Sequence, residues 1–543
     1  MILNQTAHPD QTVSPGSRMT SRRNGDRIVQ PATELRGRDS AISSRFALWR
    51  PSVVLRWALV LGTLATAISA AGSWIPSLWG DEAASVLSAQ RSLPSLFRML
   101  GNVDAVHGTY YFFLHFWVQA FGASPFSVRF PSAIAVGVAV AGIVVLGSRL
   151  AGTRVGVLAG IVAVVLPRIT YMGEEARGYA MSAAGVVWLT ILLVHIVGLD
   201  RPRKRLWVLY AVGLAACGYI FLFSLLIVVA HVVVVLPGRR RASLRPWIKA
   251  TVGGVVLAGP VIGFGISESG QIAFLANRDS TNIRTILVTQ WFGNDLLALV
   301  AWALIITAIA VWGVTSYRAR NVLAGFDPAA ERDNRTPGLV PLAATWLLGP
   351  PAILLAVNSV HAVYSSRYLS FAVPAAALLL GWLLARIRPR IMASVLLVIV
   401  VSTSSISYFS ERTPFAKNNS DWAQIADTIR SHAQPGQGIL FDEGTRPSRA
   451  PRLALRTYPT SFDGLTDIAL KTPWYDTTNW RDSVYPSSVV ASRLGSLHGS
   501  IKTVWLVEYR WPGTVTDTYN RSMLAAKGFV VVAEYPGHAS VVL

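Results

Sequence analysis

Two neighbouring carboxylates, Asp81 and Glu82, follow Gly80 shortly after a long apolar run. That run is long enough to cross a bilayer, so both acids are expected where the first membrane helix ends. A carboxylate placed there is suited to general base catalysis, because it can take a proton from a hydroxyl group within hydrogen-bond distance. The same residue types also cap helices and solvate loops. The sequence alone leaves both interpretations open.

Three further kinds of segment place ionisable and aromatic side chains beside apolar runs. The first kind is a histidine followed by an aromatic stretch, and the second is a Glu-Glu-Ala-Arg-Gly-Tyr loop. The third kind comprises two later loops that return to the membrane. Two interpretations of the Glu-Glu loop are open. Its side chains contact a sugar or phosphate, or the charge of its acids is simply neutralised by the arginine of the same loop. The candidate residues are His107, Glu174, Glu175, Arg177, Tyr179, Trp291, Arg367 and Tyr368.

Membrane helices must position these groups, since the 543-residue chain is 52% hydrophobic and only 14% charged. Apolar runs recur at the length of about 20 residues that spans a bilayer. We predict a polytopic helical membrane protein with about eleven spans, of which the fifth and sixth are alternatively one broken helix. The predicted spans are 53–73, 130–148, 155–171, 178–197, 206–220, 222–236, 248–266, 296–314, 339–357, 368–385 and 391–408.

The distribution of basic residues predicts the orientation of these spans. Lys and Arg accumulate in cytoplasmic loops, and with the N-terminus inside every second loop of this chain is basic. The net charge of +21 is therefore explained by topology, so nucleic acid is not an expected partner. This orientation places Asp81 and the other candidate residues outside the cytoplasm, in a multi-pass protein of the plasma membrane.

The aromatic stretch 109–121 is apolar but short. As a helix it covers roughly 20 Å, less than the roughly 30 Å hydrocarbon core. Counting it as a crossing would also move a basic loop to the outer side. We therefore predict a helix that lies at the outer membrane surface.

The chain ends flank the membrane domain and differ from it in composition. Residues 1–50 form a predicted disordered basic cytoplasmic tail, and 51–408 the membrane domain. Residues 409–543 are predicted to form a small extracytoplasmic α/β domain, with strands at 438–441, 503–507 and 529–533 and a helix at 421–432. The single cysteine, Cys217, excludes an intrachain disulfide.

Five motifs follow one another along the chain, namely Gly80-Asp81-Glu82, His107-Gly108-Thr109-Tyr110-Tyr111, Arg129-Phe130-Pro131-Ser132, Glu175-Ala176-Arg177-Gly178-Tyr179 and Ser366-Arg367-Tyr368-Leu369. Together they resemble the GT-C superfamily of membrane glycosyltransferases. The chain is similar to its protein-mannosyltransferase-like and aminoarabinose-transferase-like branch, and to actinobacterial cell-envelope mannosyltransferases. The resemblance covers roughly residues 53–408.

This resemblance implies transfer of a sugar, with inversion, from a polyprenyl-phosphate donor to a glycan, lipoglycan or protein acceptor. It implies that Asp81 is the general base, helped by Glu82. Donor phosphate contacts would be Arg367 and Tyr368, with His107 and Arg177; Gly108 departs from the family, which usually has proline after this histidine. For Arg367 the alternative is an interfacial anchor. The implied substrate contacts are Glu174, Glu175, Tyr179 and Trp291.

Alternatives remain for the substrate and for the class of protein. Mannose is favoured as the sugar, and arabinofuranose is the alternative. A flippase or transporter would also have many spans, but it typically carries its ionisable groups near the bilayer midplane. A scaffold that binds polysaccharide would leave the acidic pairs without a role. No cofactor is required by the sequence, and a divalent cation held by carboxylates stays open.

Overall fold

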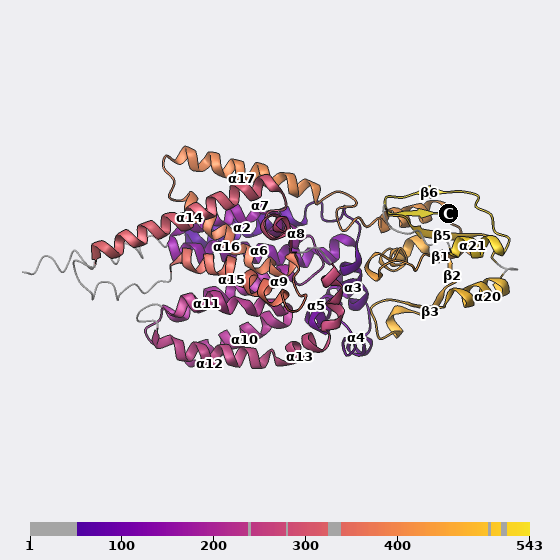
Figure 1. Cartoon of the computed structure of the whole chain (residues 1–543), viewed down its shortest axis with the longest axis horizontal. Helices are drawn as coiled ribbons and strands as arrows, with labels where there is room; N and C mark the ends of the chain where they lie inside the picture. Colours follow the sequence, from indigo (N-terminus) through magenta and orange to yellow (C-terminus); the bar gives the residue numbers. More distant parts are fainter. Residues whose placement is uncertain (1–50, 237–240, 278–280, 324–337, 498–500, 512–518) are drawn as a thin grey trace, which may run out of the picture. The chain divides into compact units, whose positions relative to one another are not determined.

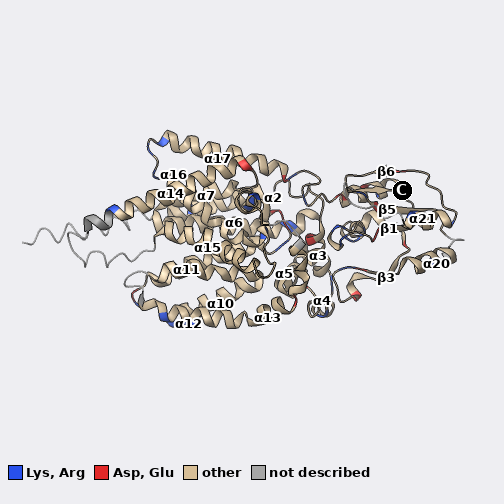
Figure 2. Ribbon diagram, in the orientation of Figure 1, with Lys and Arg blue, Asp and Glu red and all other residues tan. Residues whose placement is uncertain are grey.

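The computed structural model describes residues 51–543, apart from 237–240, 278–280, 324–337, 498–500 and 512–518 (Figure 1). The predicted tail, residues 1–50, lies outside the described residues. Within the described part, seven helices are long and apolar enough to cross a membrane, and the number rises to nine if two bent pairs each count as one span. Charged residues are sparse along these helices (Figure 2). The chain is a polytopic helical membrane protein, as predicted.

The seven continuous spans all coincide with predicted ones. In the last but one, a short 3₁₀ turn, η7, leads directly into a buried helix. The seven are α2 (Pro51–Ala70), α6 (Pro125–Ala151), α9 (Tyr179–Val197), α14 (Asp295–Leu323), α15 (Leu339–Asn358), η7 (Ser366–Ala372) with α16 (Val373–Leu384), and α17 (Arg390–Ser410).

Prolines explain the two bent pairs. Helices α7 (Thr153–Val165) and α8 (Pro167–Gly173) meet at 63°, and α12 (Arg241–Leu257) and α13 (Gly259–Ser267) meet at 52°. Pro167 and Pro260 each stand in the first turn of the second helix. Proline has no N–H for the preceding turn and disfavours the helical conformation of the residue before it.

The predicted fifth and sixth spans are two shorter antiparallel segments. Neither is among the seven to nine candidate spans of the described residues, so the predicted number of about eleven is too high. Helix α10 (Lys204–Ile220) ends at Phe221, whose backbone is extended, and η2 (Leu222–Ile227) then leads into α11 (Val228–Val235). The Tyr210 hydroxyl lies 2.8 Å from Nδ1 of His231. In one continuous helix residues 21 positions apart would be separated by roughly 31 Å. The chain therefore turns back at 221–227, and the alternative of a single broken helix is wrong.

Four short elements lie between α2 and α6, namely α3 (Gly80–Ala89), α4 (Leu93–Leu100), η1 (Ala105–His107) and α5 (Gly108–Phe121). The predicted helix at 109–121 is confirmed as α5. One of its faces is buried through Tyr111 and Leu114, and another exposes Phe116 and Phe121. This two-sided burial fits a helix at a membrane surface.

A mixed five-stranded sheet forms the centre of the C-terminal domain, in the order β2-β1-β5-β7-β6. Strand β1 pairs in parallel with β2 and β5, whereas β7 pairs antiparallel with β5 and β6. The strands are β1 (Gly438–Phe441), β2 (Thr466–Asp467), β5 (Val504–Tyr509), β6 (Tyr535–Pro536) and β7 (Ser540–Val542). The other elements are α18 (Trp422–His432), α19 (Leu453–Thr457), β3 (Leu470–Thr472), β4 (Ser483–Val484), α20 (Ser487–Leu497) and α21 (Tyr519–Ala526).

Two of the three predicted strands and the predicted helix of this domain are confirmed as β1, β5 and α18. The predicted strand at 529–533 is wrong, since the chain is irregular there and the last strands are β6 and β7. Val530 and Val532 are 80% and 87% exposed. Their side chains find no packing surface, so β propensity alone does not form a strand here.

Helix α3 packs against the C-terminal domain. Ala83 and Leu87 share a buried cluster with Ile425 of α18. The backbone N–H of Leu78 donates a 2.9 Å hydrogen bond to the Tyr458 hydroxyl. A side chain at Gly80 would place its Cβ 2.4 Å from the backbone oxygen of Ser448, so only glycine permits this approach. The helix that carries Asp81 is therefore positioned from both the membrane helices and the C-terminal domain.

Candidate functional site

A cavity of about 900 Å³, which we call the site pocket, lies where these segments meet. Its lining comes from the start of α3, the turn before α5, the 177–179 loop, the 221–223 turn, residues 265–274 at and after the end of α13, η7 and the C-terminal domain. Six of the ten predicted site residues line it. These are Asp81, His107, Arg177, Tyr179, Arg367 and Tyr368.

Arg367 joins two carboxylates at the wall of this pocket. Its Nη1 donates to Oδ2 of Asp81 at 2.7 Å and to Oε1 of Glu175 at 3.2 Å. Its guanidinium also lies 4.8 Å from the ring centroid of Trp79, within cation–π range. Burial opposes ionisation of Asp81, but Arg367 and Arg177 outweigh it and hold the pKa of Asp81 below its usual value. Asp81 is therefore a carboxylate at neutral pH.

Arg177 supplies a second cation to the same pocket. It donates to the hydroxyl of Tyr111 at 3.0 Å and to Nε2 of His107 at 3.3 Å. Its Nε is buried without a hydrogen-bond partner. No carboxylate among the described residues forms an ion pair with Arg177, although Asp81 acts on it through its charge. Arg177 therefore has one buried N–H group that lacks an acceptor.

The contact with Arg177 also fixes the state of His107. Burial and the Arg177 charge hold the pKa of His107 well below its usual value, so the ring is neutral at pH 7. An arginine only donates hydrogen bonds. Nε2 of His107 is therefore the acceptor, and Nδ1 carries the proton.

Aromatic rings form an apolar wall beside the two arginines. Tyr368 stacks on Phe223 with ring centroids 5.1 Å apart, and Phe221 lies 5.7 Å from Tyr368 and 5.1 Å from Tyr179. The site pocket therefore combines cations with an aromatic surface at the ends of membrane helices. That combination suits an amphiphile with a phosphate group and a hydrocarbon chain.

Glu82 does not line the site pocket, although it is adjacent to Asp81. Its carboxylate is fully buried and takes two hydrogen bonds from Arg129, at 2.7 Å and 2.5 Å. It also accepts the backbone N–H of Ala176 at 3.0 Å. Arg129 in turn donates to the backbone oxygens of Pro76 and Ser77. This ion pair connects α6 to the segments on both sides of the pocket, which is a positioning role.

Glu174 likewise points away from the pocket, toward the chain that follows α17. It forms ion pairs of 3.1 Å with both Arg412 and Lys417. Burial and the neighbouring charge of Glu174 raise the pKa of Glu411 to about 8. Of the two predicted substrate contacts Glu174 and Glu175, only Glu175 contacts Arg367.

Trp291 lies in the core of the membrane helices and is only 2% exposed. Its ring packs edge-on against Trp302, at 6.4 Å between centroids. It is not among the residues that line the site pocket. Its neighbour Gln290 receives a short hydrogen bond from Tyr364, so this loop is fixed from within the bundle.

Several lining residues were not predicted from the sequence. Asp104 has a left-handed backbone, with φ of 60°, and accepts a 3.0 Å hydrogen bond from Tyr111. Burial raises the pKa of Asp104 despite the nearby Arg177. Aspartate is one of the few residue types that tolerate this backbone conformation, but no pattern marks it in the sequence. Glu268 and the C-terminal residues Arg446 and Arg481 also line the pocket.

Acidic residues approach one another in the pocket without forming a cluster typical of metal sites. Within the described residues, no group of three or more His, Cys, Asp or Glu side chains could hold a metal ion. Asp81 and Glu175 share Arg367 instead.

Comparison with known proteins gives one family match in sequence. The family model described as dolichyl-phosphate-mannose-protein mannosyltransferase matches residues 109–263. The matched part contains Arg177 and Tyr179 but neither Asp81 nor Arg367. No curated protein matches the chain in sequence.

Solved structures match over much more of the chain. ArnT from Cupriavidus metallidurans bound to undecaprenyl phosphate has 12% identity and a TM-score of 0.53, covering 90% of this chain and 97% of its own. The chain has the ArnT fold. The apo structure of ArnT gives the same coverage and identity with a TM-score of 0.51. An oligosaccharyltransferase from Archaeoglobus fulgidus, with Zn and sulfate, is more distant, at 10% identity, 84% and 72% coverage and a TM-score of 0.45.

Proposed function

We propose that the chain is a glycosyltransferase that moves a sugar from a polyprenyl-phosphate donor to an acceptor hydroxyl, with inversion. The observation that carries this proposal is the ion pair between Asp81 and Arg367 inside a pocket with an aromatic wall. The pair provides a base and a phosphate ligand within one hydrogen bond of each other. The description of the matching family and the lipid phosphate bound to ArnT support the same chemistry.

Donor binding exchanges the partners of Arg367. In the structure Arg367 is paired with Asp81 and Glu175. A donor phosphate that takes one of its N–H groups competes with Asp81, because guanidinium forks bind phosphate in two places. Release from Arg367 raises the basicity of Asp81 at the moment when the acceptor is present. Arg177, with its unpartnered Nε, is the second phosphate ligand.

Transfer then needs one proton acceptor and one stabilised leaving group. Asp81 takes the proton from the acceptor hydroxyl as its oxygen forms a bond to the anomeric carbon. The bond from that carbon to the phosphate oxygen breaks on the opposite side, and the electron pair leaves with the phosphate. Arg367 and Arg177 stabilise the charge that develops there. Neutral His107 accepts a hydrogen bond from Arg177 and so orients its guanidinium.

We propose mannose as the sugar, in keeping with the family description; a pentose such as arabinofuranose is the alternative. The acceptor is a glycan, lipoglycan or protein outside the cytoplasm, in line with the basic loops on the other side. The C-terminal domain contributes Arg446, Trp480 and Arg481 to the pocket wall and is proposed to contact the acceptor.

Incubation of membranes containing the protein with radiolabelled polyprenyl-phosphate mannose tests the proposal. We expect transfer of label to a glycan, lipoglycan or protein fraction, and loss of transfer with Asp81→Asn. Label that crosses the membrane without leaving its carrier would instead indicate a flippase. Transfer from the arabinose donor alone would retain the enzyme class and correct the sugar.

A further inference from the structure

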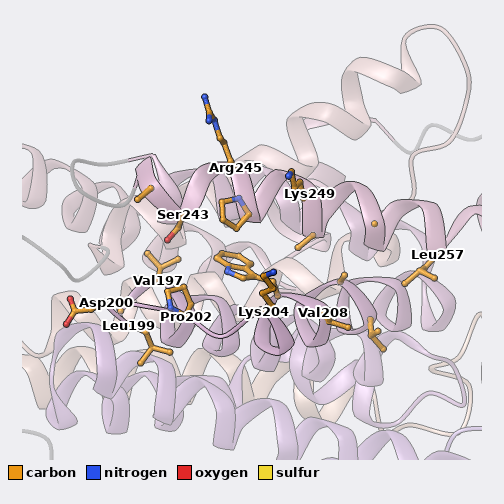
Figure 3. A pocket seen from close by; sticks show the side chains of 18 of the residues that line it. Val197, Leu199, Asp200, Pro202, Lys204, Val208, Ser243, Arg245, Lys249 and Leu257 are labelled. Atoms are coloured by element: carbon orange, nitrogen blue, oxygen red, sulfur yellow. The ribbon is translucent and has the colours of Figure 1, made fainter.

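A second cavity, which we call the groove, lies between α10 and α12 and is larger than the site pocket, at about 1160 Å³ (Figure 3). The end of α9 and the loop that follows it close one end of the groove. None of the residues that line it also lines the site pocket.

The groove and the site pocket lie at opposite ends of the same helices. Tyr179, the first residue of α9, lines the site pocket, and Val197, its last, lines the groove. The 19 residues of α9 span roughly 28 Å at 1.5 Å each. Helix α10 repeats the arrangement, from Lys204 in the groove to Phe221 in the site pocket. The two cavities therefore face opposite leaflets, and the groove is not part of the catalytic site.

The walls of the groove are apolar and exposed. Val208 and Val212 on α10 are 62% and 49% exposed, and Val256 on α12 is 68% exposed. From Arg245 to Leu257 the groove follows α12 over roughly 18 Å. The groove is open at Gly253, because an added Cβ at this position would meet nothing within 4 Å. A hydrocarbon chain fits such a surface.

Cations gather at the loop end of these walls. Lys204, Arg245 and Lys249 line the groove, against one acid, Asp200. Figure 3 shows Lys204 between the two helices and Lys249 on α12, whereas Arg245 points away from α10. The loop before Lys204 adds the exposed side chains of Arg201 and Arg203. An anionic group therefore complements this end, and an apolar chain complements the rest.

We propose that the groove binds a phospholipid with an anionic headgroup, taken from the leaflet opposite the site pocket. The phosphate lies at Lys204 and Lys249, and an acyl chain lies along Val208, Val212 and Val256. This site does not depend on the proposed glycosyl transfer.

The test uses the full-length chain, purified in detergent and titrated with phosphatidylglycerol or with phosphatidylcholine of the same acyl chains. Native mass spectrometry counts the lipids retained. We expect one tightly retained phosphatidylglycerol and weaker retention of phosphatidylcholine. Gly253→Phe fills the groove and should remove that lipid. Gly263→Phe is the matched control, because position 263 also has open space and does not line the groove.

A second pair of variants tests the headgroup and does not require a ring in the groove. Lys204→Gln with Lys249→Gln should abolish the preference for phosphatidylglycerol, with roughly a five-fold loss of affinity for each lysine. Arg390→Gln removes an exposed cation that does not line the groove and should leave the preference unchanged.

Three results would overturn the proposal. The first is equal retention of both lipids by the unsubstituted protein. The second is undiminished phosphatidylglycerol retention by Gly253→Phe together with an unchanged lipid preference in the double lysine variant. The third is displacement of the retained lipid by undecaprenyl phosphate at equal concentration. The last result would make the groove a carrier site. Asp81→Asn should not alter lipid retention, which separates this site from the proposed catalytic one.

Discussion

The carboxylate of Asp81 accepts a 2.7 Å hydrogen bond from the guanidinium of Arg367, which is 286 residues further along the chain. The pair keeps the proposed base ionised and the proposed phosphate ligand oriented. In the proposed mechanism a donor phosphate separates the two groups. Each partner should therefore produce a different kinetic defect when it is replaced.

Asp81→Asn should reduce turnover by about 10²–10⁴-fold or more, because general base catalysis typically contributes that factor. Donor affinity should be unchanged or slightly increased, since Arg367 loses a competing partner. Single-turnover transfer and equilibrium binding of labelled donor measure the two effects. Asp427→Asn, at an exposed position on α18, is the control. Loss of donor binding with persisting turnover would make Asp81 a substrate ligand and not the base.

Arg367→Gln should weaken donor binding and shift the pH profile. Arg367 contributes to holding the pKa of Asp81 below its usual value. Without this guanidinium the pKa of Asp81 rises, so the ionised base is lost at a higher pH. The acidic limb of kcat/KM, which reports the free enzyme, should move upward in pH. Arg367→Lys should restore the charge and the limb, but only part of the affinity. An unmoved limb in Arg367→Gln would contradict Asp81 as the titrating group.

Glu82→Gln should lower the stability of the folded protein. Removing one partner of a buried ion pair typically costs roughly 3–5 kcal/mol, because the other charge stays buried. Thermal unfolding in detergent should show a clear fall in Tm. Adding Arg129→Met should recover part of the lost Tm, although the backbone carbonyls of Pro76 and Ser77 then lose the hydrogen-bond donor that Arg129 provides. A variant with full stability and no turnover would instead return Glu82 to the catalytic group.

Gly80→Ala should lower turnover because it displaces α3, the helix that carries Asp81. The new Cβ would lie 2.4 Å from the backbone oxygen of Ser448, so α3 must shift. A displacement of about 1 Å at a catalytic group can cost roughly 10²-fold in rate. Gly101→Ala is the control, because its nearest neighbour is at 3.6 Å. Equal activity in the two variants would contradict the close packing of α3 on the C-terminal domain.

Glu411→Gln should change how stability depends on pH. In the unfolded chain this carboxyl has its ordinary pKa of 4.5, whereas burial and Glu174 raise the pKa to about 8 in the folded protein. The unfolded state therefore loses its proton first, and Glu411 lowers stability progressively as the pH rises through this window. The Tm advantage of Glu411→Gln should grow from pH 4.5 to pH 8, with Asp463→Asn as an exposed control. Parallel curves would contradict the raised pKa.

The sequence predicted the membrane helices because the length and polarity of an apolar run are local properties. It also selected loops whose side chains meet in the structure, since Asp81, Arg177 and Arg367 all line one pocket. The reversal between α10 and α11 required the contact of Tyr210 with His231, which no local pattern contains.

The sequence did not predict which of two neighbouring acids faces the pocket. Consecutive residues of a helix point about 100° apart, so Asp81 faces the pocket while Glu82 faces Arg129. Glu174 and Glu175 divide in the same way between Lys417 and Arg367. Which member of each pair turns toward the pocket depends on partners far along the chain.

The shared core of α3 and α18 bears on how such proteins can be recombined. Ala83 and Leu87 of α3 are fully buried in a cluster that includes Trp422 and Phe441 of the C-terminal domain. A chimera that grafts the C-terminal domain of a relative onto this chain must therefore exchange residues 78–91 with it. A graft that begins after the last membrane helix would leave Ala83 and Leu87 without the packing partners that they have here.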